Sequence, residues 1–290
     1  MELRCSEILE KIFEWIPNSE GYETKIKPIL ISRDSIGEFN HIALLNRFAY
    51  TIVDQQRDVN TVVIPLWNTL LYYGMNREFI CESPYAPLVI SSIFQAYGHQ
   101  QYHTKEDLKI QKKSGASRTD AFLQCYRERS SLEFLNLILE ERENLLYLFK
   151  ILTKYSFISD KSAAFFLRDI EELKFSLVPI DSNVARSLQR TGLFFTDFEK
   201  SLLDFEMIIK KIIPIKKRTD PKNFRALSDK IFEICKENDK SPYKLNRYLF
   251  LLGADFCQYN RCNSCQIKDS CFYYNMTENE KLLFLNKIKS

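Results

Sequence analysis

Apolar residues recur at helical spacing in one segment of the chain after another. Near the N-terminus, one such stripe comprises Ile8, Leu9, Ile12, Phe13 and Ile16. The same periodicity predicts helices over residues 42–53, 62–73 and 245–254, and one long amphipathic helix over 132–152. No segment alternates between apolar and polar residues for long enough to predict a strand. The pattern therefore predicts an all-α fold.

Several predicted helices begin with a recognisable capping signal. Ser130 and Glu133 have the spacing of a capping box, and so do Thr196 and Glu199. Asp220–Pro221 and Ser241–Pro242 each combine an N-cap residue with a proline in the first turn. Only 7 of the 290 residues are glycine and 9 are proline, which is too few for the many tight turns of an all-β protein.

Composition narrows the class of protein further. Apolar residues make up 45% of the chain and charged residues 27%, which fits a globular protein and not a disordered one. No apolar run approaches the roughly 18–20 residues that a membrane span needs. Acidic residues among the first fifteen positions do not fit a signal peptide. We expect a protein without a membrane partner that is cytoplasmic, or nuclear in a eukaryote.

Basic residues are clustered although the net charge is only +3. One cluster comprises Lys210, Lys211, Lys216, Lys217 and Arg218, with no acid between them. The other comprises Lys105, Lys109, Lys112, Lys113 and Arg118, partly offset by Glu106 and Asp107. Either cluster can follow a phosphate backbone or can be a solvated surface. The proline-containing segment 212–222 is also the best candidate for an interdomain linker, with 21–35 as a second.

Four of the eight cysteines lie within fifteen residues. Cys257, Cys262, Cys265 and Cys271 form the spacing C-x4-C-x2-C-x5-C. Four soft ligands on one short loop predict a metal centre, either zinc or an iron–sulfur cluster. A zinc ribbon normally has two C-x2-C pairs, whereas this loop has one, so the spacing favours a [4Fe–4S] cluster over zinc. The isolated Cys5, Cys81, Cys125 and Cys235 are typical of small buried hydrophobes.

The stretch from Arg261 to Cys271, RCNSCQIKDSC, resembles the iron–sulfur loop of endonuclease III and the adenine-mismatch glycosylases. These enzymes belong to the helix-hairpin-helix DNA glycosylase superfamily. Their first two cysteines are separated by six residues, and here four separate Cys257 from Cys262. The resemblance implies a two-domain helix-hairpin-helix fold with a C-terminal [4Fe–4S] loop. It assigns residues 41–165 to a helical barrel domain, and residues 1–40 plus 166–290 to a discontinuous iron–sulfur domain.

A lysine and an aspartate extend the resemblance. By themselves, Lys161 reads as an exposed residue at a helix start and Asp181 as an N-cap. In the family, a lysine begins the second helix of the hairpin, and an aspartate follows in a V/L-D-x-H/N-V/I pattern that VPIDSNV matches here. The resemblance makes Lys161 a nucleophile toward the sugar and Asp181 its electrostatic partner. It places Asn183 and Arg186 among the DNA-binding residues.

A glutamine-containing turn is the third matching patch. Gln55 takes, by resemblance, the position of the residue that the family inserts into the gap left by the extruded base, and Gln56 stands beside it. Gln56 also reads as a polar residue of an interhelical turn. Adenine glycosylases carry a catalytic glutamate at the position of Thr51. The chain therefore does not match adenine-mismatch chemistry.

The hairpin turn departs from the family pattern L-P-G-V-G-x-K. Phe157 and Ser159 replace its two glycines, and Asp160 adds a negative charge where a DNA phosphate would approach. Neither replacement easily adopts positive φ. By resemblance, Ser159 and Ser162 lie at the phosphate-facing positions. Two explanations are open. Either the turn has another geometry and the basic clusters make the contacts to DNA phosphates, or the glycosylase reaction has been lost.

The resemblance implies a monomer that is associated with the nucleoid, and it leads to two expected functions. The first is a DNA N-glycosylase acting on double-stranded DNA, which flips and excises a modified or damaged base. An AP-lyase step follows if the lysine acts as the nucleophile. The alternative is a non-catalytic nucleic-acid-binding protein on the same scaffold, which the glycine-free hairpin favours.

Overall fold

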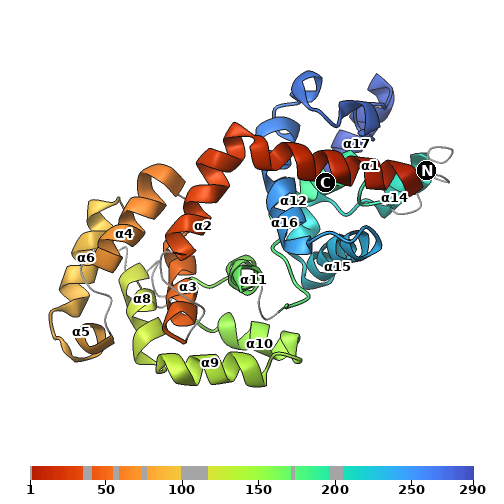
Figure 1. Ribbon diagram of the computed structural model, residues 1–290. Helices are drawn as coiled ribbons and strands as arrows, with labels where there is room; N and C mark the ends of the chain where they lie inside the picture. Colours follow the sequence, from red (N-terminus) through yellow and green to blue (C-terminus); the bar gives the residue numbers. More distant parts are fainter. Residues whose placement is uncertain are drawn as a thin grey trace. The chain divides into compact units, whose positions relative to one another are not determined.

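A computed structural model describes residues 2–34, 41–54, 59–72, 77–98, 117–170, 174–195 and 205–290 (Figure 1). All regular structure in these residues is helical, and no strand occurs among them. The predicted all-α class is confirmed. The chain divides into two compact units, which are described separately: unit 1 comprises residues 1–26 and 176–290, and unit 2 comprises residues 27–175. None of the described helices is both long and apolar enough to cross a membrane.

Unit 2 is built around α3 (His41–Val53), which packs against α8, α9 and α11. Its other helices are α2 (Lys27–Asp34), η3 (Val59–Val63), α4 (Ile64–Tyr72), α5 (Arg77–Glu82), α6 (Ala86–Ala96), α8 (Arg118–Arg127), α9 (Ser131–Glu140), α10 (Leu145–Leu152) and α11 (Asp160–Asp169). Aromatic rings fill the core: the Phe48 ring lies 5.0 Å from those of Phe134 and Tyr155 and 5.1 Å from that of Phe166. This cluster fixes the segment that precedes α11.

Unit 1 is built around α12 (Ser182–Thr191), most of whose side chains are buried. α12 packs against α16 and η6. The other elements are α1 (Glu2–Trp15), η1 (Ile16–Asn18), η2 (Tyr22–Ile26), α14 (Phe205–Lys211), η5 (Ile215–Thr219), α15 (Pro221–Glu237), α16 (Pro242–Leu251), η6 (Leu252–Cys257), η7 (Cys262–Ser264), η8 (Lys268–Ser270) and α17 (Glu278–Lys289). The predicted N-terminal stripe is correct, because Ile8, Leu9, Ile12 and Ile16 are all buried.

The structure contains the predicted helix caps wherever their residues are described. Ser130 and Glu133 form the predicted capping box at the start of α9. Asp220 accepts hydrogen bonds from two backbone N–H groups of α15, and Ser241 accepts one from Lys244 in α16. Thr196 and Glu199 lie outside the described residues. These side chains act within one helical turn, which is why the sequence predicts them well.

The single helix predicted over 132–152 is wrong. α9 ends at Glu140 and α10 begins at Leu145, because a turn intervenes and the Asn144 side chain caps α10 by accepting from the Tyr147 backbone N–H at 3.3 Å. The apolar periodicity continues across this turn, so it hides the break. The predicted 62–73 helix is present as far as Tyr72, because η3 ends at Val63 and α4 continues from Ile64 without a break.

Domain boundaries also differ from the predicted positions. α2 and the whole of α11 pack in unit 2, although the predicted bounds placed α2 and the end of α11 in the discontinuous domain. The segment 212–222 is not a linker, because Ile212 and Pro214 are buried and η5 packs against α12 within unit 1. The other linker candidate, 21–35, is helical over Tyr22–Asp34 and contains the division at residues 26 and 27.

Candidate functional site

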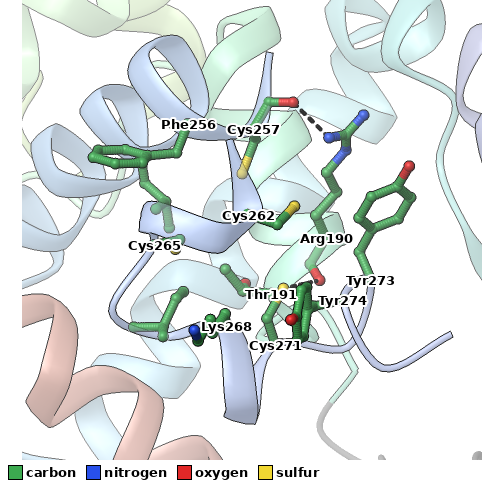
Figure 2. A pocket seen from close by; sticks show the side chains of 12 residues that line it. Arg190, Thr191, Phe256, Cys257, Cys262, Cys265, Lys268, Cys271, Tyr273 and Tyr274 are labelled. Atoms are coloured by element: carbon green, nitrogen blue, oxygen red, sulfur yellow. Dashed lines mark hydrogen bonds between the residues drawn. The ribbon is translucent and has the colours of Figure 1, made fainter. Parts of the chain in front are cut away.

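The four clustered cysteines of unit 1 line one small cavity. Its volume is about 20 Å³, and Figure 2 shows the cysteines among the side chains that surround it. Cys257 is the last residue of η6, Cys262 begins η7, Cys265 follows η7 and Cys271 follows η8. Cys257, Cys265 and Cys271 are buried, and Cys262 is half-buried. The helical turns between them bring all four cysteines to the lining of this cavity.

Burial dominates the electrostatics of these thiols, and repulsion among them adds a smaller effect in the same direction. Burial raises the pKa of Cys265 to about 12, against a hydrogen bond from the Ile267 backbone that lowers it. Burial also raises the pKa of Cys257 and of Cys271, and neighbouring thiols of the group raise both further. The backbones of Tyr274 and Tyr273 oppose the shift at Cys271 through hydrogen bonds to its sulfur. Thiols in such a site become stable thiolates when a metal provides compensating charge.

Arg190 contributes a buried positive charge beside the cysteines. Its Nη1 donates to the carbonyl oxygen of Cys257 and, at 2.7 Å, to Oδ1 of Asn260. Its guanidinium lies 4.4 Å from the ring centroid of Tyr273. The positive charge lowers the pKa of Cys257, although less than burial raises it. Sequence analysis missed Arg190, because an arginine in a helix usually reads as a surface residue.

The residue types around the cavity are those that hold a soft metal or an iron–sulfur cluster in proteins. Four thiols, backbone N–H donors to sulfur and a buried cation are features that stabilise bound thiolates. Among the described residues, however, no three His, Cys, Asp or Glu side chains are close enough together to hold a metal ion. The cavity has room for little more than a water molecule. Side chains of the cysteines must therefore rotate from this arrangement to bind either group.

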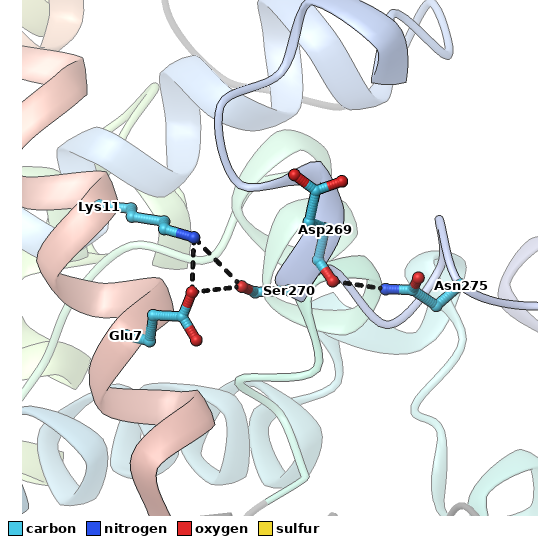
Figure 3. Close-up of polar contacts among 5 residues, drawn as sticks. All are labelled: Glu7, Lys11, Asp269, Ser270 and Asn275. Atoms are coloured by element: carbon cyan, nitrogen blue, oxygen red, sulfur yellow. Dashed lines mark hydrogen bonds and ion pairs between the residues drawn. The ribbon is translucent and has the colours of Figure 1, made fainter.

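The N-terminal helix holds the cysteine loop from one side. Ser270 Oγ donates to Glu7 Oε1 at 3.0 Å, and Lys11 Nζ contacts both groups, at 2.5 Å from Glu7 Oε1 and 3.4 Å from Ser270 Oγ (Figure 3). On the other side, Asn275 Nδ2 donates to the carbonyl oxygens of Asp269 and Cys271. Both contacts act on residues next to Cys271. The position of this cysteine is therefore set from outside the loop.

Asp181 is the N-cap of α12 and is 6% exposed. Its Oδ1 accepts hydrogen bonds from the backbone N–H groups of Asn183 and Val184, both at 2.8 Å. Its Oδ2 accepts no hydrogen bond from the residues that the structure describes. One oxygen therefore anchors the helix, while the other remains available to a ligand.

Asn183 and Arg186 are brought together by a hydrogen bond near the start of α12. Arg186 Nη1 donates to Asn183 Oδ1 at 2.8 Å and approaches the carbonyl oxygen of Gly253 at 3.5 Å. Burial lowers the pKa of Arg186, and the nearby charge of Arg190 lowers it further. Both predicted DNA-binding side chains thus lie beside Asp181 on unit 1.

The turn before α11, which was predicted to be a hairpin turn, has a left-handed residue. Phe157 has φ of +65°, and the Ile158 N–H donates to the Tyr155 carbonyl oxygen at 3.1 Å, so Phe157 is the third residue of a hydrogen-bonded turn. This position favours glycine when its φ is positive. Ser159, at the second glycine position, has φ of −87° and is the N-cap of α11. Phe157 therefore has the positive φ that is typical of glycine, although the residue at this position is not glycine.

Lys161 lies in the first turn of α11 in unit 2, with an exposed side chain. Its Nζ is 5.3 Å from the ring centroid of Phe165. Ser159 Oγ accepts from the Ser162 backbone N–H at 3.3 Å and lies 3.1 Å from Ser162 Oγ. The two serines predicted to face phosphate therefore contact each other. Lys161 and Asp181 belong to different units.

The glutamine patch is only partly described. Gln55 and Gln56 lie outside the described residues. Thr51, at the end of α3, is buried and donates from Oγ1 to the Phe48 carbonyl oxygen at 2.6 Å. Thr51 is thus engaged within its own helix.

Comparisons of the chain with protein-family models, curated proteins and solved structures find no match.

Proposed function

We propose that the protein is a DNA N-glycosylase that flips a modified or damaged base out of double-stranded DNA and excises it. The proposal combines the sequence resemblance with the local geometry of the three patches. Lys161, Asp181 and the four cysteines have the chemistry that this reaction and its scaffold require. A helix-hairpin-helix fold is part of the proposal.

The left-handed backbone at Phe157 is the observation that carries the proposal. A bulky residue at positive φ costs of order 1–3 kcal/mol, and such strain concentrates at functional sites. Tyr155 and Ile158 on either side are buried at 4% and 5% exposure, so core packing holds the turn. The strained position coincides with the first glycine of the family's hairpin. This coincidence supports a retained hairpin geometry directly before Lys161.

Lys161 is the proposed nucleophile. Its unprotonated amine attacks the sugar C1′, the bond from C1′ to the base breaks, and the base takes up a proton as it leaves. The attacking nitrogen then loses a proton, the C1′–O4′ bond opens with O4′ becoming protonated, and a protonated Schiff base between Nζ and C1′ results. This intermediate permits β-elimination of the 3′ phosphate, which is the lyase step. Among the described residues no carboxylate pairs with Lys161, so its amine is free to contact a substrate.

Asp181 is the proposed electrostatic partner. Its Oδ2 would stabilise positive charge that develops on the sugar as the base departs. The two backbone hydrogen bonds to Oδ1 fix the carboxylate, so it needs little reorganisation during the reaction. Asn183 and Arg186, beside it on α12, would contact the DNA backbone. A [4Fe–4S] cluster on the four cysteines would stabilise the loop that packs beneath α12.

A non-catalytic nucleic-acid-binding protein is the second candidate. The exposure of Lys161 favours it, because a nucleophilic lysine usually lies in a desolvated site. Asp160 also adds a negative charge next to the proposed phosphate-binding turn. This candidate keeps the scaffold, the cysteine centre and DNA binding, but not the reaction.

Borohydride trapping on duplexes with abasic sites and base lesions separates the two candidates. A glycosylase with lyase activity gives a covalent protein–DNA adduct that Lys161→Ala abolishes. Lys154→Ala is the matched control, because Lys154 is also exposed and lies seven residues earlier in unit 2. Wild type without adduct or strand scission rejects the lyase step. Absence of base release as well rejects the enzyme.

Asp181→Asn tests the carboxylate without removing the cap. Asparagine caps a helix about as well as aspartate, whereas alanine costs about 1 kcal/mol. We expect Asp181→Asn to fold as wild type but to release base at least tenfold more slowly, as measured in single-turnover assays. Unchanged base release in a folded Asp181→Asn variant would remove Asp181 from the mechanism.

A further inference from the structure

Lysines on one stretch of unit 1 have no acidic partners among the described residues. We call residues 210–217 the lysine segment: it contains Lys210 and Lys211 at the end of α14, and Lys216 and Lys217 in η5. All four side chains are exposed, and residues 207–219 contain no Asp or Glu. Within the described ranges, no carboxylate pairs with any of them. Other lysines of unit 1 form ion pairs, namely Lys11, Lys25, Lys230, Lys240 and Lys281.

Buried apolar residues alternate with the lysines and hold the segment in place. Ile208 and Ile212 are 2% and 3% exposed and belong to a cluster with Phe272 and Phe284. Gln189 of α12 also donates a hydrogen bond from Nε2 to the Ile213 carbonyl oxygen. Because the apolar side of the segment is fixed in the core, the lysines are held on its outer side.

The same core holds the cysteine loop. Cys271 is a member of the cluster around Ile208 and Ile212, and Cys262 packs against it. η5 also packs against α12, the helix that begins after Asp181. The lysine segment, α12 and the cysteine loop are therefore parts of one folded body.

We propose that the lysine segment binds the phosphodiester backbone of DNA. Lysine ammonium groups act as point charges on phosphates and need no particular base sequence. A membrane surface fits less well, because the segment's own apolar residues are buried or half-buried and so offer no anchor for a bilayer. The choice of DNA as the polyanion rests on the proposed function. The segment would supply phosphate contacts in place of those that the hairpin glycines make in the family.

The salt dependence of DNA binding tests this proposal. The variant Lys210→Gln, Lys211→Gln, Lys216→Gln, Lys217→Gln removes four charges from exposed positions. Each lost phosphate contact reduces the slope of log K against log salt by about 0.9, so we expect a decrease of about 2–4 in its magnitude and at least a tenfold loss of affinity near 50 mM salt. Fluorescence anisotropy of a labelled duplex with the full chain measures both quantities.

Two control variants make the result specific. Lys150→Gln, Lys174→Gln, Lys236→Gln, Lys244→Gln changes the net charge equally at four other exposed lysines, and should keep the wild-type slope. Replacing the four lysines of the segment by arginine keeps the charge, and should restore the slope. Circular dichroism confirms that each variant is folded. An equal loss in both glutamine variants, or no loss in either, overturns the proposal.

The outcomes also separate this proposal from the proposed function. Base release by wild type together with an unchanged slope in the lysine-segment variant rejects the segment and keeps the enzyme. A reduced slope without any base release or adduct rejects the enzyme and keeps the segment. Binding of wild type, but not of the variant, to vesicles of phosphatidylcholine and phosphatidylserine, with DNA binding unaffected, would assign the segment to a lipid surface instead.

Discussion

Gly253 lies directly against the backbone of Asn183. A Cβ at position 253 would be 2.1 Å from the Asn183 carbonyl oxygen and 2.6 Å from its carbonyl carbon. The same oxygen accepts a hydrogen bond from Ser187 Oγ at 3.0 Å. Through this contact η6, which ends in Cys257, packs against the first turn of α12, which Asp181 caps. Because Gly253 has no side chain, the two backbones can pack closely, and this packing joins the cysteine loop to the helix that the proposed catalytic carboxylate caps.

Gly253→Ala should destabilise unit 1 by about 2–3 kcal/mol, because the added methyl meets backbone atoms that cannot rotate away. An alanine in a helix is normally more stable than glycine, so the sign itself is informative. Denaturant unfolding of the variant measures the effect. Gly21→Ala is the matched control: its Cβ would meet Asp255 Oδ2 at 2.4 Å, and that side chain can move. Equal stability of the two variants would contradict this prediction.

Phe157→Gly and Phe157→Ala should differ in stability because of the backbone alone. Both variants remove the ring, which lies beneath the guanidinium of Arg118 at 5.3 Å, but only alanine retains a Cβ at positive φ. We expect the glycine variant to be more stable than the alanine variant by about 1 kcal/mol. Thermal unfolding of both proteins measures this difference. Greater stability of the alanine variant would mean that the turn does not have a left-handed residue in solution.

The sequence predicted the local features of the fold better than the long-range ones. Caps at Ser130, Asp220 and Ser241 depend on residues within one turn, and all three are confirmed. The break before Leu145 was missed because the apolar spacing continues across it. The π-helical form of η6 was missed as well, because one wider turn leaves little trace in periodicity.

For the candidate site, residue type and spacing identified the cysteines but not what supports them. A loop of four cysteines is unusual in any sequence, and the structure brings all four to one cavity. Arg190 and Gly253 gave no such signal, because their roles depend on partners about 60 to 70 residues away, Gly253 on Asn183 and Arg190 on Cys257 and Asn260. The burial of segment 212–222 likewise depends on distant partners, so the sequence alone suggested a linker.

Arg190→Lys should destabilise the cysteine loop although it keeps the positive charge. Both hydrogen bonds, to the Cys257 carbonyl oxygen and to Asn260 Oδ1, come from Nη1 at the tip of the guanidinium, which the shorter lysine side chain does not reach. A buried acceptor left without a donor costs about 1–3 kcal/mol. Denaturant unfolding should show a loss of about 2 kcal/mol. Arg225→Lys is the control, because Arg225 forms an exposed pair with Asp229 and such pairs contribute little. Similar small losses in both variants would contradict a structural role for Arg190.

Metal content should depend on the clustered cysteines and not on the isolated ones. Protein purified without oxygen should be coloured and contain iron and sulfide. Serine at any of Cys257, Cys262, Cys265 or Cys271 should lower the iron content strongly, and Cys235→Ser should not, since Cys235 is buried on α15 away from the loop. Removing the metal should also lower the midpoint of thermal unfolding, because metal binding and folding are coupled. A colourless protein with stoichiometric zinc would support the zinc alternative. An equal loss of metal from the Cys235→Ser variant would contradict a metal centre at the four clustered cysteines, whether iron–sulfur or zinc.

The capping box of α17 should make stability depend on pH in the acidic range. Hydrogen bonds from the Thr277 hydroxyl and backbone N–H to Glu280 Oε2, at 2.7 and 2.8 Å, lower the pKa of Glu280 below its value in the unfolded chain. The unfolded chain therefore binds more protons in this window, and the stabilisation is complete above about pH 4.5, the ordinary glutamate value, and is lost as the pH falls through the lowered pKa.

Glu280→Gln should remove most of this pH dependence. Glutamine can still accept from Thr277 but does not titrate, so the variant should match wild type at low pH and be less stable near neutrality by a few tenths of a kcal/mol, as expected for an exposed group. Urea unfolding at several pH values measures the difference. Glu278→Gln provides the control, because Glu278 lies in the same turn and pairs with Lys281 without forming the capping box. Phe284 and Ile288 of α17 pack in the same core cluster as Cys271, so the helix itself should remain folded in the variant. An identical pH dependence of stability for wild type and Glu280→Gln would show that the capping box does not form at the start of α17.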